Sequence, residues 1–360
     1  MPRCEIIDAA SLDPAMRVAW NRMRAADPVL ASPYFAPEFT EAVASVTKTT
    51  RLLVVHENGT PVALLPFQRR TAGLCGPVGG HLNDIHGLIA APGFQADPAN
   101  LLESAGLQML SLRHAPVGQA ALGARFGAPH AFHVMDLADG YDVYEGRREP
   151  NAKSAFRAIR TRDAKARKQY GSVTHVFEET NPAVFDRLIA WKREQYAATG
   201  QPSLFDFGWV RELAGRLHSS RDAALRGQLS CLYFGDTLVA AHFGLRTRDV
   251  LHYWFPGYDP AFADLSPGNI LLHHMAKSAA AQGCKALHLG SGDYRYKLEF
   301  ADRSFTVTDG VAFARSFMGR AAAAAGLALA RMDRTLPEPL AGLPVKAMRR
   351  IDRHLAFRAA

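Results

Sequence analysis

The stretch His252–Phe300 constrains the fold of this chain more than any other part of it. The run Leu251–Phe255 at its start is short and rich in aromatic residues, which favours a strand. Apolar residues at helical spacing follow over Ile270–Ala279, and a second short apolar run covers Ala286–Leu289. This order predicts a strand, a crossover helix and a second strand, with the two strands parallel.

Two polar segments are expected at one edge of this unit. Ser266-Pro267-Gly268-Asn269 opens the helix, with Ser266 as the expected N-cap and Pro267 in the first turn. Gly290-Ser291-Gly292-Asp293 follows the second strand, at the carboxyl end where open α/β sheets bind ligands. Amides at a helix start favour phosphates, so this edge is a candidate anion site. An ordinary capped helix in a βαβ unit explains the same pattern.

The composition is typical of a globular protein, and the chain is long enough for two domains. The 360 residues are 48% hydrophobic and 21% charged. Since no apolar run approaches the roughly 20 residues of a membrane span, and the first residues lack the layout of a signal peptide, we expect a cytoplasmic protein. The four cysteines stand far apart and form no CxxC pair, which favours reduced thiols over disulfides or zinc.

A hairpin pattern occurs twice. Leu52–Leu65 has two apolar runs around Asn58-Gly59, one of the strongest short turn signals, and Ser230–Ala241 repeats the arrangement around Gly235-Asp236. At one offset, three residues of the first hairpin meet identical residues in the second: a threonine, a valine and an alanine. Two copies of one module of about 150 residues would explain the match. A chance likeness between two hairpins is the alternative.

A basic helix is predicted over Asn151–Tyr170. Its face of basic residues, at a period near 3.6, contains Lys153, Arg157, Arg160 and Arg167. Such a face attracts phosphate or sugar-nucleotide anions, which arginine can bind with two hydrogen bonds. The alternative is a solvated helix face.

The loop Gly79–Gly87 is dense in polar groups between apolar neighbours. His81, Asp84 and His86 are residue types that can ligate a metal, but their spacing has no defined ligand geometry. We therefore expect no metal there and treat Asp84 as a candidate substrate contact. A merely solvated loop is the alternative.

Three motifs resemble those of a known family. They are LxxWKREQYxxTG from Leu188, YWFPGYDPxFADLSPGNILL from Tyr253 and LGSGDYRYKLEF from Leu289. Together they resemble the CelD/BcsL-like acetyltransferases, which stand with the Fem peptidyltransferases in the Gcn5-related N-acyltransferase (GNAT) superfamily. The resemblance covers roughly residues 153–313, and the first half matches more loosely. It implies an α/β fold of tandem Fem-like modules, each a mixed sheet flanked by helices, over residues 1–145 and 146–314, with a basic helical tail over 315–360.

The resemblance also implies an N-acetyltransferase that uses acetyl-CoA as co-substrate and needs no metal. Asp293 would act as base or orient the amine, and Lys297 would stabilise developing negative charge or neutralise a substrate phosphate. Tyr296 would donate a proton to the leaving group, with core packing as the alternative. Donor-binding candidates are Ser266, Gly268, Asn269 and Ile270. Substrate-binding candidates are Asp84, Lys153, Arg157, Arg160, Tyr253 and Trp254.

The donor and the acceptor are expectations of the same kind. The usual pyrophosphate loop of the superfamily, Arg/Gln-x-x-Gly-x-Gly/Ala, is replaced by Leu265-Ser266-Pro267-Gly268-Asn269. Fem relatives use aminoacyl-tRNA, but the body of this chain has no extended basic stretch of the kind that tRNA needs, so we expect acetyl-CoA. Relatives act in exopolysaccharide production, including cellulose and holdfast polymers, so a nucleotide-bound or lipid-linked amino sugar is the expected acceptor. The alternative functions are a non-catalytic nucleotide-binding regulator of polysaccharide synthesis and a Fem-like aminoacyl-tRNA-dependent transferase.

The C-terminal region carries most of the excess positive charge. The formal net charge is +8, and residues 315–360 hold nine Lys and Arg against three acidic residues. A helix is predicted over Arg315–Arg334, and a second basic amphipathic piece over Val345–Phe357. This tail is a candidate contact for the inner membrane face or for a cyclic dinucleotide, with packing on the protein body as the alternative. No DNA partner is expected.

Overall fold

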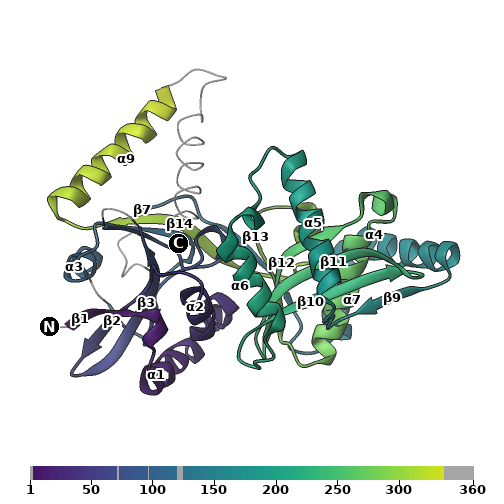
Figure 1. Ribbon diagram of the computed structural model, residues 1–360, viewed down its shortest axis with the longest axis horizontal. Coiled ribbons are helices and arrows are strands. Elements are labelled where there is room, and N and C mark those ends of the chain that lie inside the picture. The colour runs from purple at the N-terminus through teal and green to yellow at the C-terminus, as the bar shows by residue number, and fades with distance from the viewer. Residues whose placement is uncertain (1–2, 71–72, 96, 120–124, 336–360) are drawn as a thin grey trace. The chain divides into compact units, whose positions relative to one another are not determined.

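The computed structural model describes residues 3–70, 73–95, 97–119 and 125–335. Contacts divide the chain into two compact units. One consists of the described residues of Met1–His130 and Thr306–Ala360, and the other is Ala131–Phe305. Each unit has a β-sheet with helices packed on it (Figure 1), which confirms the predicted α/β architecture.

The first unit has a mostly antiparallel sheet in the order β1-β2-β3-β4-β6-β14. These strands are β1 (Arg3–Asp8), β2 (Thr50–Glu57), β3 (Thr60–Arg69), β4 (Leu74–Gly76), β6 (Met109–Pro116) and β14 (Arg303–Phe313). The short strands β5 (Ile89–Ala90) and β7 (Arg125–Phe126) pair with β3 and β14. The helices are α1 (Pro14–Ala25), α2 (Pro37–Ala44) and α3 (Pro98–Ser104). Buried apolar residues such as Leu53, Phe67 and Leu110 form the core.

The second unit has a sheet in the order β8-β13-β12-β11-β10-β9. These strands are β8 (His130–Asp136), β9 (Val173–Val176), β10 (Arg226–Phe234), β11 (Thr237–Arg246), β12 (Val250–Tyr258) and β13 (Ala286–Ser291). The helices are α4 (Tyr141–Tyr170), α5 (Pro182–Ala198), α6 (Gly208–Ser219), α7 (Pro267–Ala281) and α8 (Arg295–Phe300). Helices α4 and α7 share one buried core with the sheet. On α5 and α6, Phe185 and His218 contact Phe243 of β11.

Both predicted hairpins are confirmed, as β2–β3 and β10–β11. Asn58 and Gly59 have positive φ angles of 50° and 79°, as a tight hairpin turn requires. In each hairpin the second residue pair from the turn is followed by a one-residue bulge, at Val62 in the first and Val239 in the second. Because bulges shift register at a specific position, the shared bulge supports two copies of one module.

The predicted βαβ unit is also confirmed. Strand β12 pairs in parallel with β13, and α7 connects them. The predicted N-cap at Ser266 is wrong in its geometry. Ser266 adopts a left-handed backbone with φ 50° and ψ 55°, and its side chain makes no capping hydrogen bond. The preceding 3₁₀ helix (Pro260–Leu265) enters α7 through this residue, so the extended backbone that a serine cap needs is not available.

Two further elements differ from the sequence-based expectation. Helix α4 begins ten residues before the predicted start at Asn151, and Pro150 lies inside it, next to a kink at Ala152 with φ −137°. The sequence suggested a helix start where there is a kink, because proline breaks the hydrogen-bond ladder. Strand β14, assigned by our predicted boundary to the second module, pairs from Val307 onward with β6 of the first unit.

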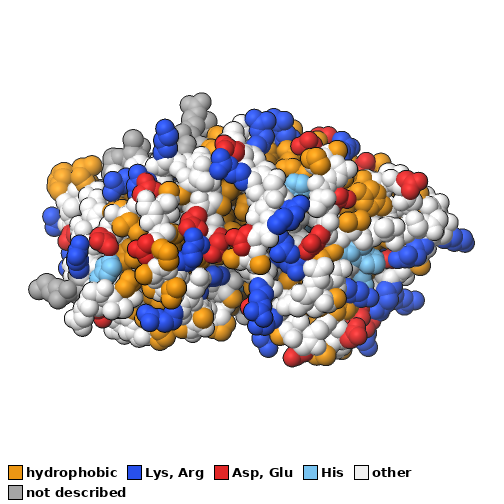
Figure 2. Space-filling view, turned by 60° about the horizontal axis from the view of Figure 1, so that its bottom comes forward, with side chains coloured by type: hydrophobic (Ala, Val, Ile, Leu, Met, Phe, Trp, Pro, Cys, Tyr) orange, Lys and Arg blue, Asp and Glu red, His pale blue; other side chains and the backbone are white. Residues whose placement is uncertain are grey.

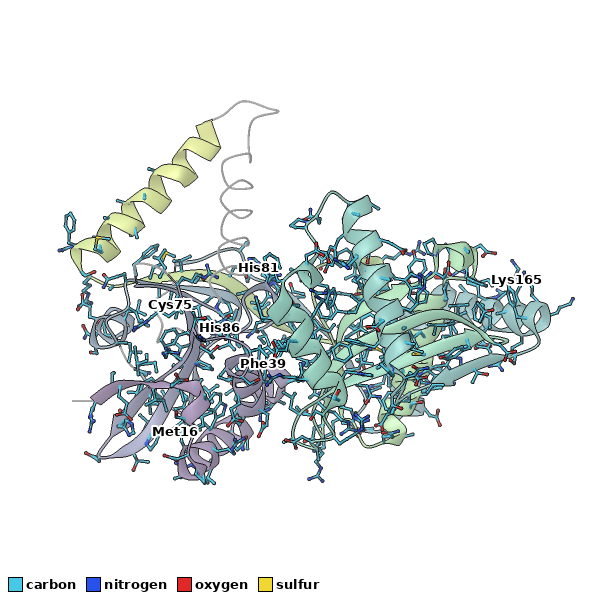
Figure 3. All side chains as sticks on the ribbon, in the orientation of Figure 1. Met16, Phe39, Cys75, His81, His86 and Lys165 are labelled. Atoms are coloured by element: carbon cyan, nitrogen blue, oxygen red, sulfur yellow. The ribbon has the colours of Figure 1, made fainter. Side chains whose placement is uncertain are left out.

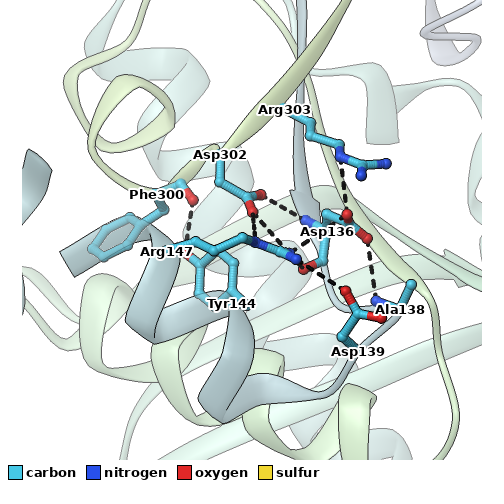
Figure 4. Close-up of polar contacts among 8 residues, drawn as sticks. All are labelled: Asp136, Ala138, Asp139, Tyr144, Arg147, Phe300, Asp302 and Arg303. Carbon is cyan, nitrogen blue, oxygen red and sulfur yellow. Dashed lines mark hydrogen bonds and ion pairs between the residues drawn. The ribbon is translucent and has the colours of Figure 1, made fainter. Parts of the chain in front are cut away.

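A network of ion pairs joins the start of α4 to the segment that follows α8 (Figure 4). Arg147 donates to Asp302 Oδ2 at 3.1 Å, to Asp139 Oδ2 at 3.0 Å and to the Asp136 carbonyl at 2.9 Å. Asp136 is also paired with Arg303 at 2.9 Å. Tyr144 donates to the Phe300 carbonyl at 2.6 Å. These contacts fix the end of α8, which follows the polar loop of the predicted site.

The predicted tail helix is present as α9 (Phe317–Thr335), near the limits expected from the sequence. Its first two residues expose large apolar side chains: Phe317 is 79% exposed and Met318 is 54% exposed. The second amphipathic piece, residues 345–357, lies outside the described residues. Within the described part of the chain, no helix combines the length and the apolar character needed to cross a membrane. Membrane or dinucleotide binding by the tail stays a prediction.

Candidate active site

The second unit contains a pocket where two parallel strands separate. Strand β12 pairs with β13 over Val250–His252 and then continues for six residues, whereas β13 pairs with β8 along its length, including Gly290 and Ser291 beyond its last pair with β12. The pocket has a volume of about 410 Å³. Its lining residues are Trp191, Glu194, Gln195, Ala198, Tyr253, Pro256, Gly257, Tyr258, Pro260, Gly268, Asn269 and Tyr296.

One wall of the pocket is helix α5. Trp191, Gln195 and Ala198 are spaced by four and three residues, so they share the helix face that meets β12. Gly257 permits this close approach, because a Cβ atom there would lie 2.7 Å from Leu188 Cδ1. This segment belongs to the motif that begins at Leu188, and its residues are not among the predicted site residues. Their helical spacing was the signal that could have identified them.

The start of α7 forms another wall. Gly268 and Asn269, two predicted donor-binding residues, line the pocket. Gly268 is the first residue of α7 with a backbone N–H, since Pro267 has none. A Cβ atom at Gly268 would meet one neighbour, Tyr258 Cδ1 at 3.9 Å, so there is open space above it. This wall therefore presents the positive end of a 15-residue helix to the pocket, which suits an anion.

A bulge in β12 positions the residues between the pocket and the core. The register with β11 shifts between Phe243 and Leu245, opposite Tyr253 and Trp254. His242 takes the place of the missing strand partner, because its Nε2 accepts the Trp254 N–H at 3.0 Å. The His242 ring stacks on Tyr253 with centroids 4.4 Å apart. Tyr253, a predicted substrate-binding residue, lines the pocket, whereas the Trp254 ring packs against Phe255 and is not part of the lining.

The loop after β13 carries the three predicted catalytic residues. Tyr296 lines the pocket, with its ring 6.0 Å from that of Tyr253. Asp293 and Lys297 are not among the lining residues. Asp293 is 78% exposed and lies 3.3 Å from Nε2 of His133, a partner that the sequence did not indicate. Lys297 is buried and donates to the Ser291 carbonyl at 2.5 Å.

The other predicted site residues lie elsewhere. Ile270 is buried in the core of the second unit, and the Ser266 side chain does not line the pocket. On α4, Arg160 pairs with Glu145 and Glu149, while Lys153 and Arg157 are exposed. The predicted basic face is thus partly neutralised. Across the surface of the molecule that Figure 2 shows, basic and acidic side chains are interspersed. Asp84 belongs to the first unit.

A buried lysine beside the pocket was also missed. Lys192 follows the lining residue Trp191, is 8% exposed, and donates to Gln195 Oε1 at 2.7 Å. Burial lowers its pKa to about 8. His242 is fully buried, and burial, followed by the nearby His252 and Lys192, lowers its pKa well below the usual value. Both side chains therefore favour their neutral forms more than usual. His242 lies beside the bulge in β12, and Lys192 lies on α5.

In the first unit, the loop Gly79–Gly87 uses its histidines structurally (Figure 3). His86 is buried, and its Nε2 donates to the Pro66 carbonyl at 2.7 Å. Burial lowers the pKa of His86 to about 4. His81 Nδ1 lies 2.6 Å from Arg113 Nη1. These contacts give His81 and His86 separate structural partners within the unit.

Residues 153–298 match a family model described as an acetyltransferase (GNAT) domain. This range includes the pocket, α7 and the loop after β13. No curated protein sequence matches the chain. The matched range nearly coincides with the region in which we identified a family resemblance from motifs, and it supports an N-acyltransferase type of activity. Membership of the CelD/BcsL-like group stays a prediction.

Solved structures share the fold over most of the chain. FemX superposes with a TM-score of 0.54 at 11% identity, covering 86% of this chain and 97% of FemX. A tandem GNAT protein from the clavulanic acid pathway gives 0.53 at 12% identity, covering 88% and 99%. The C-terminal domain of a putative lysylphosphatidylglycerol synthetase from Agrobacterium fabrum gives 0.51 at 12% identity, covering 84% and 95%. The chain therefore has the tandem GNAT fold of Fem-like proteins, and its residues 153–298 carry the match to the GNAT acetyltransferase domain.

Proposed function

We propose that this protein is an N-acyltransferase that transfers the acyl group of a thioester, with acetyl-CoA as donor, to a primary amine. The observation that carries the proposal is the pocket between the separating strands β12 and β13, bordered by the start of α7, inside the GNAT-matched range. The helix start suits the phosphates of the donor. The apolar and aromatic lining suits its acyl end.

The chemistry requires few groups. The neutral amine nitrogen attacks the carbonyl carbon, the new N–C bond forms, and the C–S bond breaks to release a thiolate. The amine proton passes to a base, for which the pair of Asp293 and His133 is the candidate, since Asp293 is exposed to solvent and His133 can orient it. Tyr296, in the pocket lining, is the candidate donor of a proton to the thiolate.

The acceptor we propose is an amino sugar of a cell-envelope polysaccharide, bound to a nucleotide or a lipid. The pocket carries a carboxylate, Glu194, which lies 3.9 Å from Arg187 and is 60% exposed. A solvated carboxylate beside the reaction centre attracts an ammonium group before it loses its proton. The exposed Lys153 and Arg157 on α4 are the candidate contacts for the phosphates of such an acceptor.

Acetyl-CoA titration of two glycine variants tests the donor. Gly268→Phe places a ring in the open space above the start of α7, where backbone φ does not require glycine. We expect wild-type protein to bind acetyl-CoA with micromolar affinity and Gly268→Phe to lose it. Gly215→Phe is the matched control, because Gly215 also lies in a helix with open space around its Cβ position. This variant should bind normally.

Turnover tests the acceptor separately. Release of free thiol from acetyl-CoA is measured with nucleotide-linked amino sugars, and with the same sugars already N-acetylated as blank. Thiol release with the free amines alone supports the proposed acceptor class. Acetyl-CoA binding without such turnover rejects the acceptor and keeps the donor. Absence of acetyl-CoA binding by the wild type rejects the donor, and charged tRNA is then titrated instead.

A further inference from the structure

A bulge in the first unit brings a histidine and an aspartate side by side. Leu112 of β6 pairs with Gly310 of β14 and Ala115 pairs with Thr308, so two residues, Arg113 and His114, oppose Asp309. His114 has a positive φ of 46°, one of three such non-glycine residues in the described chain. Its backbone N–H donates to Asp309 Oδ1 at 2.9 Å. Positive φ in a residue other than glycine is costly and often serves a site.

A second histidine reaches the same place from the start of β8. The Gly127 N–H donates to the Asp309 carbonyl at 2.7 Å, which holds the segment before β8 against β14. His130 follows three residues later, and its ring meets that of His114 edge to face, with centroids 5.2 Å apart. One nitrogen of each imidazole and one carboxylate oxygen of Asp309 all lie within 4.8 Å of one another.

Hydrogen bonds fix the tautomer of both histidines. Nδ1 of His114 lies 2.8 Å from the Asp84 carbonyl and 3.2 Å from its carboxylate, and Nδ1 of His130 lies 3.3 Å from the Ala128 carbonyl. A carbonyl oxygen can only accept, so in the neutral rings Nδ1 carries the proton and Nε2 keeps its lone pair. Ligating histidines show this arrangement, with the second nitrogen bound to a carboxylate or carbonyl.

We propose that His114, His130 and Asp309 bind a divalent transition-metal ion, with zinc as the best fit. Nε2 of each histidine and one carboxylate oxygen give three ligands, and water completes the tetrahedron. His114 Nε2 and Asp309 Oδ1 are 4.0 Å apart, and bonds of about 2.0–2.2 Å to a shared ion need a small rotation. The Asp309 side chain is 59% exposed and can turn its second carboxylate oxygen toward the ion, whereas His114 is 12% exposed.

Sequence spacing could not indicate this site. Its ligands come from three strand ends or bulges, and Asp309 lies nearly 180 residues after His130. The loop Gly79–Gly87 contributes Asp84 as the support of His114 rather than a ligand. The site lies wholly in the first unit, outside the GNAT-matched range. Its open fourth position would let the bound ion take a further anionic or nitrogen ligand.

Zinc binding by the full-length chain tests the proposal. Protein freed of metal with a chelator is titrated with zinc chloride, and bound zinc is measured by elemental analysis after dialysis. Wild type should bind one zinc per chain, and bound Co²⁺ should give the visible absorption of a tetrahedral site. His114→Gln, His130→Gln and Asp309→Asn should each weaken zinc binding by about 100-fold or more, and Asp84→Asn by about 10- to 100-fold.

His56→Gln is the matched control. His56 is also a part-buried histidine of the first unit, and its Nε2 pairs with Glu5 at 3.0 Å, but it has a single carboxylate partner. This variant should bind one zinc. Asp309→Asn removes the charged ligand but should keep the fold, because the amide oxygen still accepts the His114 N–H. Circular dichroism verifies the fold of each variant. Less than one zinc in wild type, or zinc binding in the three ligand variants equal to that of wild type, would overturn the proposal and leave His114 as a hydrogen-bond partner of Asp84.

Discussion

The imidazole of His242 accepts a hydrogen bond from the backbone N–H of Trp254 across 3.0 Å. A side chain of β11 thereby satisfies a donor of β12 that the bulge removes from the strand ladder. This use of Nε2 as acceptor places the proton on Nδ1, and burial keeps the ring neutral by lowering its pKa well below the usual value. The contact holds Tyr253 at the pocket, so strand geometry and the candidate site depend on the same histidine.

Replacing His242 with leucine should destabilise the protein by about 1–3 kcal/mol, because a buried N–H loses its acceptor. His242→Gln keeps an acceptor of similar reach and should recover part of the loss. Urea unfolding measures both variants. Equal stabilities for leucine and glutamine would show that the hydrogen bond does not support the bulge.

A negative charge at the start of α7 should weaken donor binding. Asn269 lines the pocket, and Asn269→Asp places a carboxylate where phosphates are proposed to bind. We expect the Kd for acetyl-CoA to rise about tenfold, which corresponds to about 1.4 kcal/mol of repulsion. Asn181→Asp is the control, since Asn181 caps α5 through Ala183 N and aspartate caps equally well. Calorimetric titration should show an unchanged Kd for the control.

Arg147 should matter more to stability than an exposed arginine with similar pairing. Its partners Asp136 and Asp302 have side chains that are 7% and 8% exposed, so Arg147→Met leaves poorly solvated carboxylates (Figure 4). We expect a loss of about 2–3 kcal/mol in the free energy of unfolding. Arg193→Met breaks a pair with Asp206 that is more than half exposed on both sides, and should cost less than about 1 kcal/mol. Similar losses in urea melts would contradict this ranking.

Local patterns in the sequence were sufficient to predict those elements of the fold that depend on residues close together in the chain. The Asn58-Gly59 turn and the apolar spacing of α7 are such patterns, and both predicted elements are present. Strand partners are not local. Nothing in the composition of β14 says that Val307 pairs with Pro116, nearly 200 residues away. The left-handed Ser266 is also set by the preceding 3₁₀ helix, which overrides the preference of serine for an extended cap.

The candidate site also contains residues that the sequence could predict and residues that it could not. Gly268, Asn269, Tyr253 and Tyr296 were all named as site residues through the family resemblance. All four line the pocket, because the topology of one βαβ unit brings them together. Helical spacing could have identified the shared face of the α5 wall, but not the strand that this face covers. His133 beside Asp293 is separated from it by 160 residues, and only the pairing of β8 with β13 brings the two together.

Lys192 should make stability depend on alkaline pH. Burial lowers its pKa to about 8, against about 10.5 when unfolded, so between these values the unfolded chain holds a proton that the folded chain has released. The contribution of Lys192 to the free energy of unfolding therefore rises with pH from 8 to 10.5. Below pH 8 the buried lysine destabilises the folded state by its full amount. Lys192→Met should be more stable than wild type at pH 7, by up to about 3 kcal/mol, with the difference shrinking toward pH 10.5. Lys285→Met, at an exposed lysine, should show no such trend in urea melts.

Tyr296→Phe should slow the chemical step while leaving donor binding intact. The hydroxyl belongs to a lining residue, and the ring that fills the pocket wall is kept by phenylalanine. A thiolate leaves readily, so the loss in kcat should fall at the low end for general acid catalysis, about 100-fold. Tyr294→Phe removes the same group from a residue that is 66% exposed and outside the lining, so its kcat should stay unchanged. If Tyr296→Phe keeps the wild-type kcat and Kd for acetyl-CoA, the proton comes from solvent, and Tyr296 serves to shape the pocket beside Tyr253.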